Sequence, residues 1–224
     1  AMGGTWDVGV PIAGTDQLKV GETLTSFTVR RHFSDISLYE VFTGVRFSGL
    51  SLSVQPNQIS TISLTCMGKD KTTGNISGAT RSAVNTNTPF SGHEAGTIKE
   101  GGTTYAGITG LELSLSNGIE SAFELGSDTT GDHIIGRSNV TGTVTAYFSN
   151  ATLLDKFINE TESSLEYTMT DVDGNTLRFV IPRIKYTGGQ PDVSGEGAIT
   201  LSMPFQALYD TATATNFYIE RNPA

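Results

Sequence analysis

The sequence predicts an all-β protein, mainly a β-sandwich or barrel of about ten strands, with one flanking α-helix near residues 151–160. The first observation is that apolar residues alternate with Ser or Thr along many segments, as they do in half-buried strands. The second is that 26 Gly and 7 Pro interrupt these segments. The third is the length of 224 residues, which suits one large β domain. We therefore expect a flexible N-terminal arm over residues 1–22 and a single domain over residues 23–224.

The first strands are expected over residues 24–33, 44–54 and 59–67, the last two forming a long hairpin. In the hairpin, Val45 and Phe47 occupy odd positions, whereas Leu50 and Leu52 occupy even positions. An extra residue moves later side chains to the other face of a strand, so this change of phase predicts a β-bulge at Ser48–Gly49.

The middle of the chain begins with residues 69–103, which show no periodicity and are expected to form a long loop, a feature that is usually functional or disordered. Alternation then predicts strands over residues 108–115 and 119–125. Asn117–Gly118 between them is typical of a tight turn, so these two strands are expected to pair. A further strand is expected over residues 140–148.

One segment has a helical period: Leu153, Leu154, Phe157 and Ile158 recur on one face of residues 151–160. Asn150 or Thr152 can cap this helix, and Thr152 has the capping-box spacing to Asp155. The final strands are expected over residues 164–170, 176–181, 198–208 and 216–220.

The charge balance is acidic, with 14 Lys and Arg against 23 Asp and Glu and a formal net charge of −9. Proteins that grip nucleic acid need clustered Lys and Arg, so this composition argues against that class. It is compatible with a surface along which nucleic acid passes, because like charges repel. The single cysteine, Cys66, excludes an internal disulfide and is interpreted as a small buried hydrophobic residue.

Motifs for catalysis, metal binding or cofactor binding are not found, so we expect no enzyme activity, no metal and no cofactor. His32, His93 and His133 lie far apart in the sequence. Asp171–Asn175 resembles the start of a calcium loop, but Thr176 and Pro182 occupy the positions that require Gly and an acid. A β-turn explains this segment. No apolar run approaches the ~20 residues that span a bilayer, so no membrane insertion is expected.

The most informative pattern is the alternation of apolar and hydroxyl side chains in the long hairpin. It predicts one apolar face and one wet face that is neither charged nor sticky, carrying Ser51, Ser53, Ser60, Thr61, Ser63 and Thr65. Such a face suits a wall along which something slides. Glu112, Glu120 and Glu124 are either ordinary solvent-facing charges or a negative lining that keeps a polyanion moving.

Seven segments in order and at matching spacing resemble the tail tube proteins of long-tailed bacteriophages (siphophages). They are Arg30–Arg46, Cys66–Lys69, Leu111–Gly118, Val140–Phe148, Leu154–Leu165, Phe179–Thr187 and Val193–Tyr209, and the resemblance spans residues 26–221. It implies a tail-tube-like fold and a structural virion protein, assembled in the bacterial host cytoplasm. It also implies hexameric rings that stack into a tube, through which viral DNA passes without specific binding.

The resemblance further implies tape measure, tail tip and tail terminator proteins as partners. Lumen-facing candidates are Ser51, Ser53, Ser63, Thr65, Glu112, Glu120 and Glu124. Candidates for contacts between subunits or rings are Trp6, Phe90, His93, Tyr105, Phe217 and Tyr218. Trp6 lies on the arm and suits either the core of its own chain or the surface of a neighbour.

Three alternatives remain open. The tube of a contractile secretion system would use the same ring to pass protein effectors. A β-sandwich adhesin or other binding module would expose the Ser/Thr-rich strands to solvent and bind a ligand through the long loop. An enzyme on a jelly-roll-like scaffold would need the three histidines and acidic residues to meet in one pocket.

Overall fold

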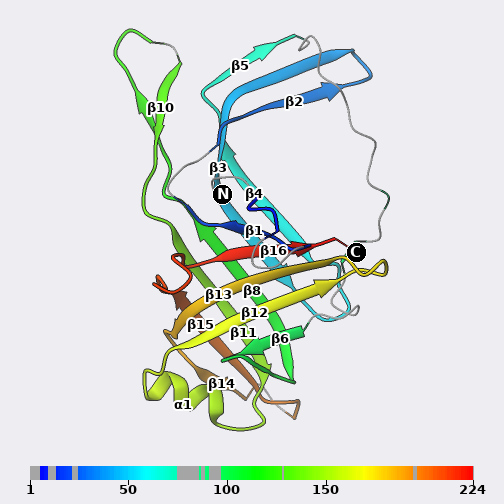
Figure 1. Ribbon diagram of the computed structural model, residues 1–224, viewed down its shortest axis with the longest axis vertical. Helices are drawn as coiled ribbons and strands as arrows, with labels where there is room; N and C mark the ends of the chain where they lie inside the picture. Colours follow the sequence, from blue (N-terminus) through cyan, green and yellow to red (C-terminus); the bar gives the residue numbers. More distant parts are fainter. Residues whose placement is uncertain are drawn as a thin grey trace.

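A computed structural model describes residues 6–9, 14–21, 25–74, 86, 89–90, 97–127, 129–193 and 196–223 of the chain. The all-β prediction is confirmed: the described elements are strands apart from one short helix (Figure 1). Fourteen strands form one hydrogen-bonded antiparallel sheet, which folds over on itself into two layers. Two further strands pair separately.

The first layer has the order β4–β3–β8–β11–β15 (Figure 1). Its strands are β3 (Leu38–Val54), β4 (Thr61–Met67), β8 (Ile108–Ser116), β11 (Asn139–Tyr147) and β15 (Thr200–Ala207). The short strand β14 (Gln190–Asp192) pairs with the first part of β15. The predicted bulge is confirmed, because the register of β3 and β4 shifts between Phe47 and Gly49.

The second layer crosses in front of the first in Figure 1 and has the order β1–β16–β13–β12–β6–β7. Its strands are β1 (Asp16–Lys19), β16 (Tyr218–Asn222), β13 (Thr176–Tyr186), β12 (Ser163–Thr170), β6 (Thr97–Glu100) and β7 (Thr103–Thr104). Residues 205–207 of β15 pair with residues 184–186 of β13 and so join the layers. Residues 16–19 thus belong to this sheet, although they were expected in the flexible N-terminal arm.

The core lies between the two layers and is filled by one side of each strand. From the first layer it takes the apolar half of each alternation, for example Leu52, Leu113 and Val144. From the second it takes Leu165, Tyr167, Phe179 and Ile219, together with Phe217, which precedes β16. Burial of these side chains stabilises the sandwich by roughly 1.5–3 kcal/mol each. Period-two patterning therefore determines which face of each strand is wet.

Helix α1 (Thr152–Ile158) forms within the predicted range 151–160. It lies at the lower end of the molecule in Figure 1. Leu153 is buried in the core. Asn150 Oδ1 accepts a hydrogen bond from the Thr152 amide at 3.0 Å, whereas the residue at the cap position itself, Ala151, provides no side-chain bond. The expected cap by Asn150 is thus present, and the expected capping box with Thr152 at the cap is not.

Two projections leave the sandwich at its upper end (Figure 1). One is an arm in which the first half of β3 pairs with β2 (Phe27–Phe33) and β5 (Asp70–Thr73). The other is the β9–β10 hairpin, formed by β9 (Glu120–Phe123) and β10 (Thr130–Ile134). Strands β5, β6 and β7 lie at the two ends of the segment 69–103 that was expected to be a loop.

The expected pairing across Asn117–Gly118 is wrong, because β8 pairs with β3 and β11 while β9 pairs with β10. Asn117 instead forms two hydrogen bonds to β3. Its backbone amide donates to Ser48 O at 2.9 Å, and its side-chain Nδ2 donates to Phe47 O at 3.1 Å. These bonds direct the chain away from a hairpin. The interpretation of Cys66 as buried is also wrong, because β4 is an edge strand and this thiol is exposed.

Candidate functional site

The outer face of the first layer carries hydroxyl and amide side chains across all five strands. Register places Ser51 opposite both Ser63 and Ser114, and places Ser53 opposite Glu112. Thr141 lies opposite Ser114 and Gln206, so the pattern continues to β15. We call this surface the hydroxyl face; it comprises Ser51, Ser53, Thr61, Ser63, Thr65, Glu112, Ser114, Ser116, Thr141, Thr143, Thr145, Ser202 and Gln206.

The hydroxyl face is concave. A depression of about 500 Å³ extends from β4 to β15, and a second one of about 350 Å³ continues toward Met67 and Gly118. Glu112 is the only charged side chain among the residues that line these two depressions. The two depressions can therefore hold a water layer and repel anions, and their lining residues include no Lys or Arg that could bind a phosphate group.

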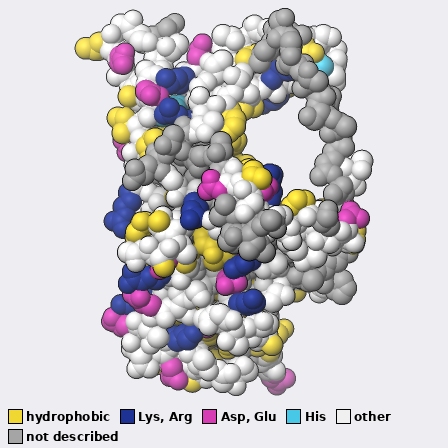
Figure 2. Space-filling model, viewed as in Figure 1, with side chains coloured by type: hydrophobic (Ala, Val, Ile, Leu, Met, Phe, Trp, Pro, Cys, Tyr) yellow, Lys and Arg dark blue, Asp and Glu magenta, His cyan; other side chains and the backbone are white. Residues whose placement is uncertain are grey.

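The second layer has a different surface. Arg178 bridges Glu166 and Glu220 across three strands, with contacts of 3.3 and 2.9 Å. Arg183 binds both carboxylate oxygens of Glu162 at 2.7 Å. Figure 2 shows Lys and Arg interspersed with Asp and Glu on the side it presents. Many charged residues of the second layer are thus paired, whereas the residues that line the two depressions of the hydroxyl face include one acid.

Five of the seven predicted lumen-facing residues come together on the hydroxyl face: Ser51, Ser53, Ser63, Thr65 and Glu112. Glu120 and Glu124 do not join them, because they lie on the separate β9–β10 hairpin and its turn. Sequence reasoning missed the contribution of β11 and β15, including Thr141, Thr143 and Ser202. The same alternation of Thr and apolar residues in 140–148 was a signal that could have identified it.

Strand β4 forms the edge of the hydroxyl face. The other face of this strand, on the core side, carries exposed apolar residues. Ile62 and Leu64 point to the core side, since they lie opposite Leu52 and Leu50 of β3. They are nevertheless 43 % and 53 % exposed. Among the described strands, β4 pairs only with β3. We call Ile62, Leu64 and the backbone edge of β4 the apolar overhang.

Most of the residues predicted to contact other subunits or rings pack within their own chain. Trp6, Phe90 and Tyr105 pack against the core, and the Arg221 guanidinium lies 4.4 Å from the centre of the Trp6 ring. Phe217 and Tyr218 are buried, and Phe217 stacks on Phe179. Their packing leaves little of these two side chains exposed, and their role between subunits or rings stays a prediction. His93 lies outside the described residues.

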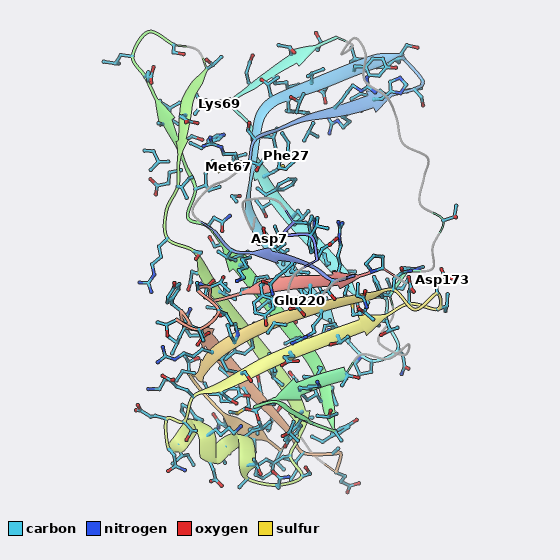
Figure 3. All side chains as sticks on the ribbon, viewed as in Figure 1. Asp7, Phe27, Met67, Lys69, Asp173 and Glu220 are labelled. Carbon is cyan, nitrogen blue, oxygen red and sulfur yellow. The ribbon has the colours of Figure 1, made fainter. Side chains whose placement is uncertain are left out.

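Within the described part of the chain, no three His, Cys, Asp or Glu residues gather in a way that could hold a metal ion. Asp171 Oδ1 instead accepts hydrogen bonds from the amides of Asp173 and Asn175, at 3.0 and 2.8 Å, which closes the β12–β13 turn (Asp173 is labelled in Figure 3). No helix among the described residues is long and apolar enough to cross a membrane.

Comparison with known proteins places the chain in a family. The model of one family, described as phage tail tube protein, matches residues 1–207. No curated protein matches the chain. The family match covers the hydroxyl face, the arm formed by β2, β3 and β5, the β9–β10 hairpin and most of the second layer. It also extends to the N-terminus, beyond the segments that carry the resemblance in sequence. The chain therefore belongs to the phage tail tube protein family, the structural proteins that build the tube of the phage tail.

Proposed function

We propose that six copies of this chain form a ring, that rings stack into a siphophage tail tube, and that viral DNA passes through the tube into the host cell. As a phage tail tube protein, the chain is a structural component of the virion tail and assembles with other tail proteins. The observation that carries the proposal is the concave hydroxyl face, whose lining contains one acid and no Lys or Arg. This face would line the bore.

Such a lining suits the passage of DNA. A protein gains affinity for DNA by neutralising phosphates with Lys and Arg, which releases counterions. The hydroxyl face lacks those cations, so DNA gains nothing by stopping on it. Glu112 would appear once per subunit around the bore and repel phosphates over roughly 8 Å at physiological salt. Hydroxyl groups would keep a water layer between the wall and the DNA.

The apolar overhang supports closure into a ring. An exposed strand edge with apolar side chains is an aggregation hazard in an isolated protein. In a ring, the next subunit would cover Ile62 and Leu64 and continue the sheet from the edge of β4. The hydroxyl face would then be continuous from one subunit to the next. Contacts of this head-to-tail kind close when the rotation between copies is an integral fraction of a turn.

The remaining roles follow from the same proposal. Tape measure, tail tip and tail terminator proteins would contact the bore and the two ends of the tube, and assembly would take place in the bacterial cytoplasm. The chain would act mechanically and electrostatically and would catalyse no reaction. Sliding and repulsion need only the geometry and charge of the hydroxyl face.

Accessibility of a thiol on the hydroxyl face tests the proposal. In a Cys66→Ser background, a Ser63→Cys variant is assembled and imaged by electron microscopy, then treated with a small maleimide or with a bulky polyethylene-glycol maleimide. We expect six-fold tubes in which the small reagent reacts and the bulky one does not. Val172→Cys, on the β12–β13 turn, is the control and should react with both. Equal reaction of Ser63→Cys with both reagents in tubes would contradict a bore lined by this face.

A further inference from the structure

The β9–β10 hairpin ends in apolar side chains that face solvent. Phe123 is 82 % exposed and Leu125, in the turn, is fully exposed. Both lie beyond the last residues of the sandwich, at the end of a projection that Figure 1 shows at the upper end of the molecule. Large exposed apolar groups on a projection are typical of an interaction site. We call Phe123 and Leu125 the hairpin tip.

The base of the hairpin is fixed to the first layer. Asp132 lies 3.2 Å from both Arg46 Nη1 and Lys69 Nζ, and Arg46 Nη1 also donates to His133 O at 3.1 Å. Ile119 and His133 are buried there. Figure 3 shows Lys69 and Met67 between the hairpin and the arm. A tip held in this way loses little conformational freedom when it binds, which favours association.

A partly apolar pocket lies at the end of strands β3 and β8 that is farther from the hairpin. It is about 130 Å³ in volume and opens between the end of β3, the start of β8, β6 and β12. We call it the end pocket; its apolar lining comes from Val54, Pro56, Ile98, Ile108, Leu111 and Tyr167. Strand β8 begins at this pocket and ends next to the hairpin, and its nine residues span about 30 Å.

We propose that the hairpin tip of one copy inserts into the end pocket of a second copy and forms the contact between stacked rings. This inference rests on the proposed function, since it assigns the residues through which the rings would stack. An apolar cavity of about 150 Å³ takes up a benzene molecule, and the end pocket, at about 130 Å³, is slightly smaller, so it has the size for one Leu side chain such as Leu125. Two different surfaces at opposite ends of a subunit make a contact that repeats along an axis without closing.

Disulfide cross-linking tests the contact directly. In a Cys66→Ser background, Leu125→Cys is combined with Pro56→Cys, which lies at the exposed rim of the end pocket. After mild oxidation of concentrated protein, we expect a ladder of covalent multimers on a non-reducing gel. Leu125→Cys combined with Val172→Cys is the matched control and should give no ladder. A double-cysteine protein that stays monomeric on the gel, or a control with an equal ladder, would overturn the inference.

Substitution of the tip gives a second measurement. Phe123→Ser with Leu125→Ser removes exposed side chains only, so the fold should persist. We expect single rings in electron micrographs where the wild type gives tubes, and the exposed control Val172→Ser should give wild-type tubes. Tubes of normal length from the double variant would overturn the inference and leave the proposed function standing. Conversely, a cross-linked ladder without six-fold rings would refute the ring and leave the tip contact intact.

Discussion

Lys156 Nζ lies 2.8 and 2.6 Å from the two carboxylate oxygens of Glu100, which connects the helix to the edge of the second layer. The Glu100 side chain is only 4 % exposed. Tyr186 Oη donates a third hydrogen bond to it at 3.3 Å, and the burial of Tyr186 together with this carboxylate raises the pKa of its hydroxyl group. Lys156 is therefore the cation that balances a buried negative charge.

Replacement of Lys156 by Met should destabilise the folded monomer strongly. It leaves the Glu100 carboxylate buried without a counter-charge, and such losses reach about 3–5 kcal/mol. The double variant Glu100→Gln with Lys156→Met should recover much of the free energy of unfolding, because no charge is left buried. Urea denaturation measures both. Lys185→Met, which removes an exposed partner of Glu160, is the control and should have almost no effect.

A second prediction concerns Gly142, in the middle of β11. A Cβ atom at this position would lie 2.3 Å from Glu112 O and 2.5 Å from Phe205 Cζ. Gly142→Ala should therefore force β8 and β11 apart and destabilise the protein by about 1–3 kcal/mol. Gly110→Ala in β8 is the matched control, because its nearest contacts are 3.7 Å away. Equal urea midpoints for the two variants would contradict this account.

Local patterns predicted most of the fold, and failed where distant contacts decide. Alternation identified the longer strands and the bulge at Ser48–Gly49, because each depends on neighbouring residues, but it missed short strands such as β1, β5 and β6. The turn signal at Asn117–Gly118 misled, because the bonds from Asn117 to Phe47 and Ser48 come from a strand 70 residues away. Cys66 has the pattern of a half-buried strand, but its exposure follows from an edge position that only the sheet order reveals.

In the candidate site, too, local patterns were predictable and features that depend on distant contacts were not. The alternation in β3 and β4 was enough to predict a hydroxyl face with Ser51 and Ser63. The alternation in residues 140–148 marks a polar side of β11, but only the long-range pairing with β8 and β15 places that side on the same face. Glu120 and Glu124 were grouped with Glu112 through closeness in sequence. The change of direction after Asn117 separates them.

A third prediction concerns pH. The His133 amide, which donates to Asp132 Oδ1 at 2.8 Å, lowers the pKa of Asp132 below its ordinary value of 3.8, with Lys69 and Arg46 contributing. A lowered pKa means that the charged form stabilises the folded contact above pH 3.8, and that this contribution is lost as the pH falls through the lower value. The base of the β9–β10 hairpin should therefore loosen at acid pH.

Amide chemical shifts of ¹⁵N-labelled protein measure this change. Between pH 6 and pH 2, the amides of β10 should shift with a midpoint below 3.8. Asp132→Asn should show the loosened spectrum already at neutral pH and should lose this titration. A variant that keeps the wild-type spectrum at neutral pH would show that the carboxylate does not hold the hairpin.

The last prediction concerns the apolar overhang, where stability and assembly should separate. Leu64 is half exposed in the monomer, so Leu64→Ser should change its free energy of unfolding by only about 0.5 kcal/mol. In the proposed ring, the same side chain is covered by the next subunit, and a hydroxyl group there would replace a buried apolar contact. Rings should therefore form poorly, although the monomer remains folded.

Ile36→Ser is the control for this prediction, because Ile36 is an exposed aliphatic residue, 65 % against 53 % for Leu64, in the β2–β3 turn of the arm. Light scattering across a concentration series, with electron microscopy of the same samples, compares the two variants. If both assemble like the wild type, the overhang does not lie between subunits. If both fail, exposed aliphatic residues act by a general effect on solubility, and the edge of β4 has no special role. Loss of rings in Leu64→Ser alone assigns the lateral contact to β4.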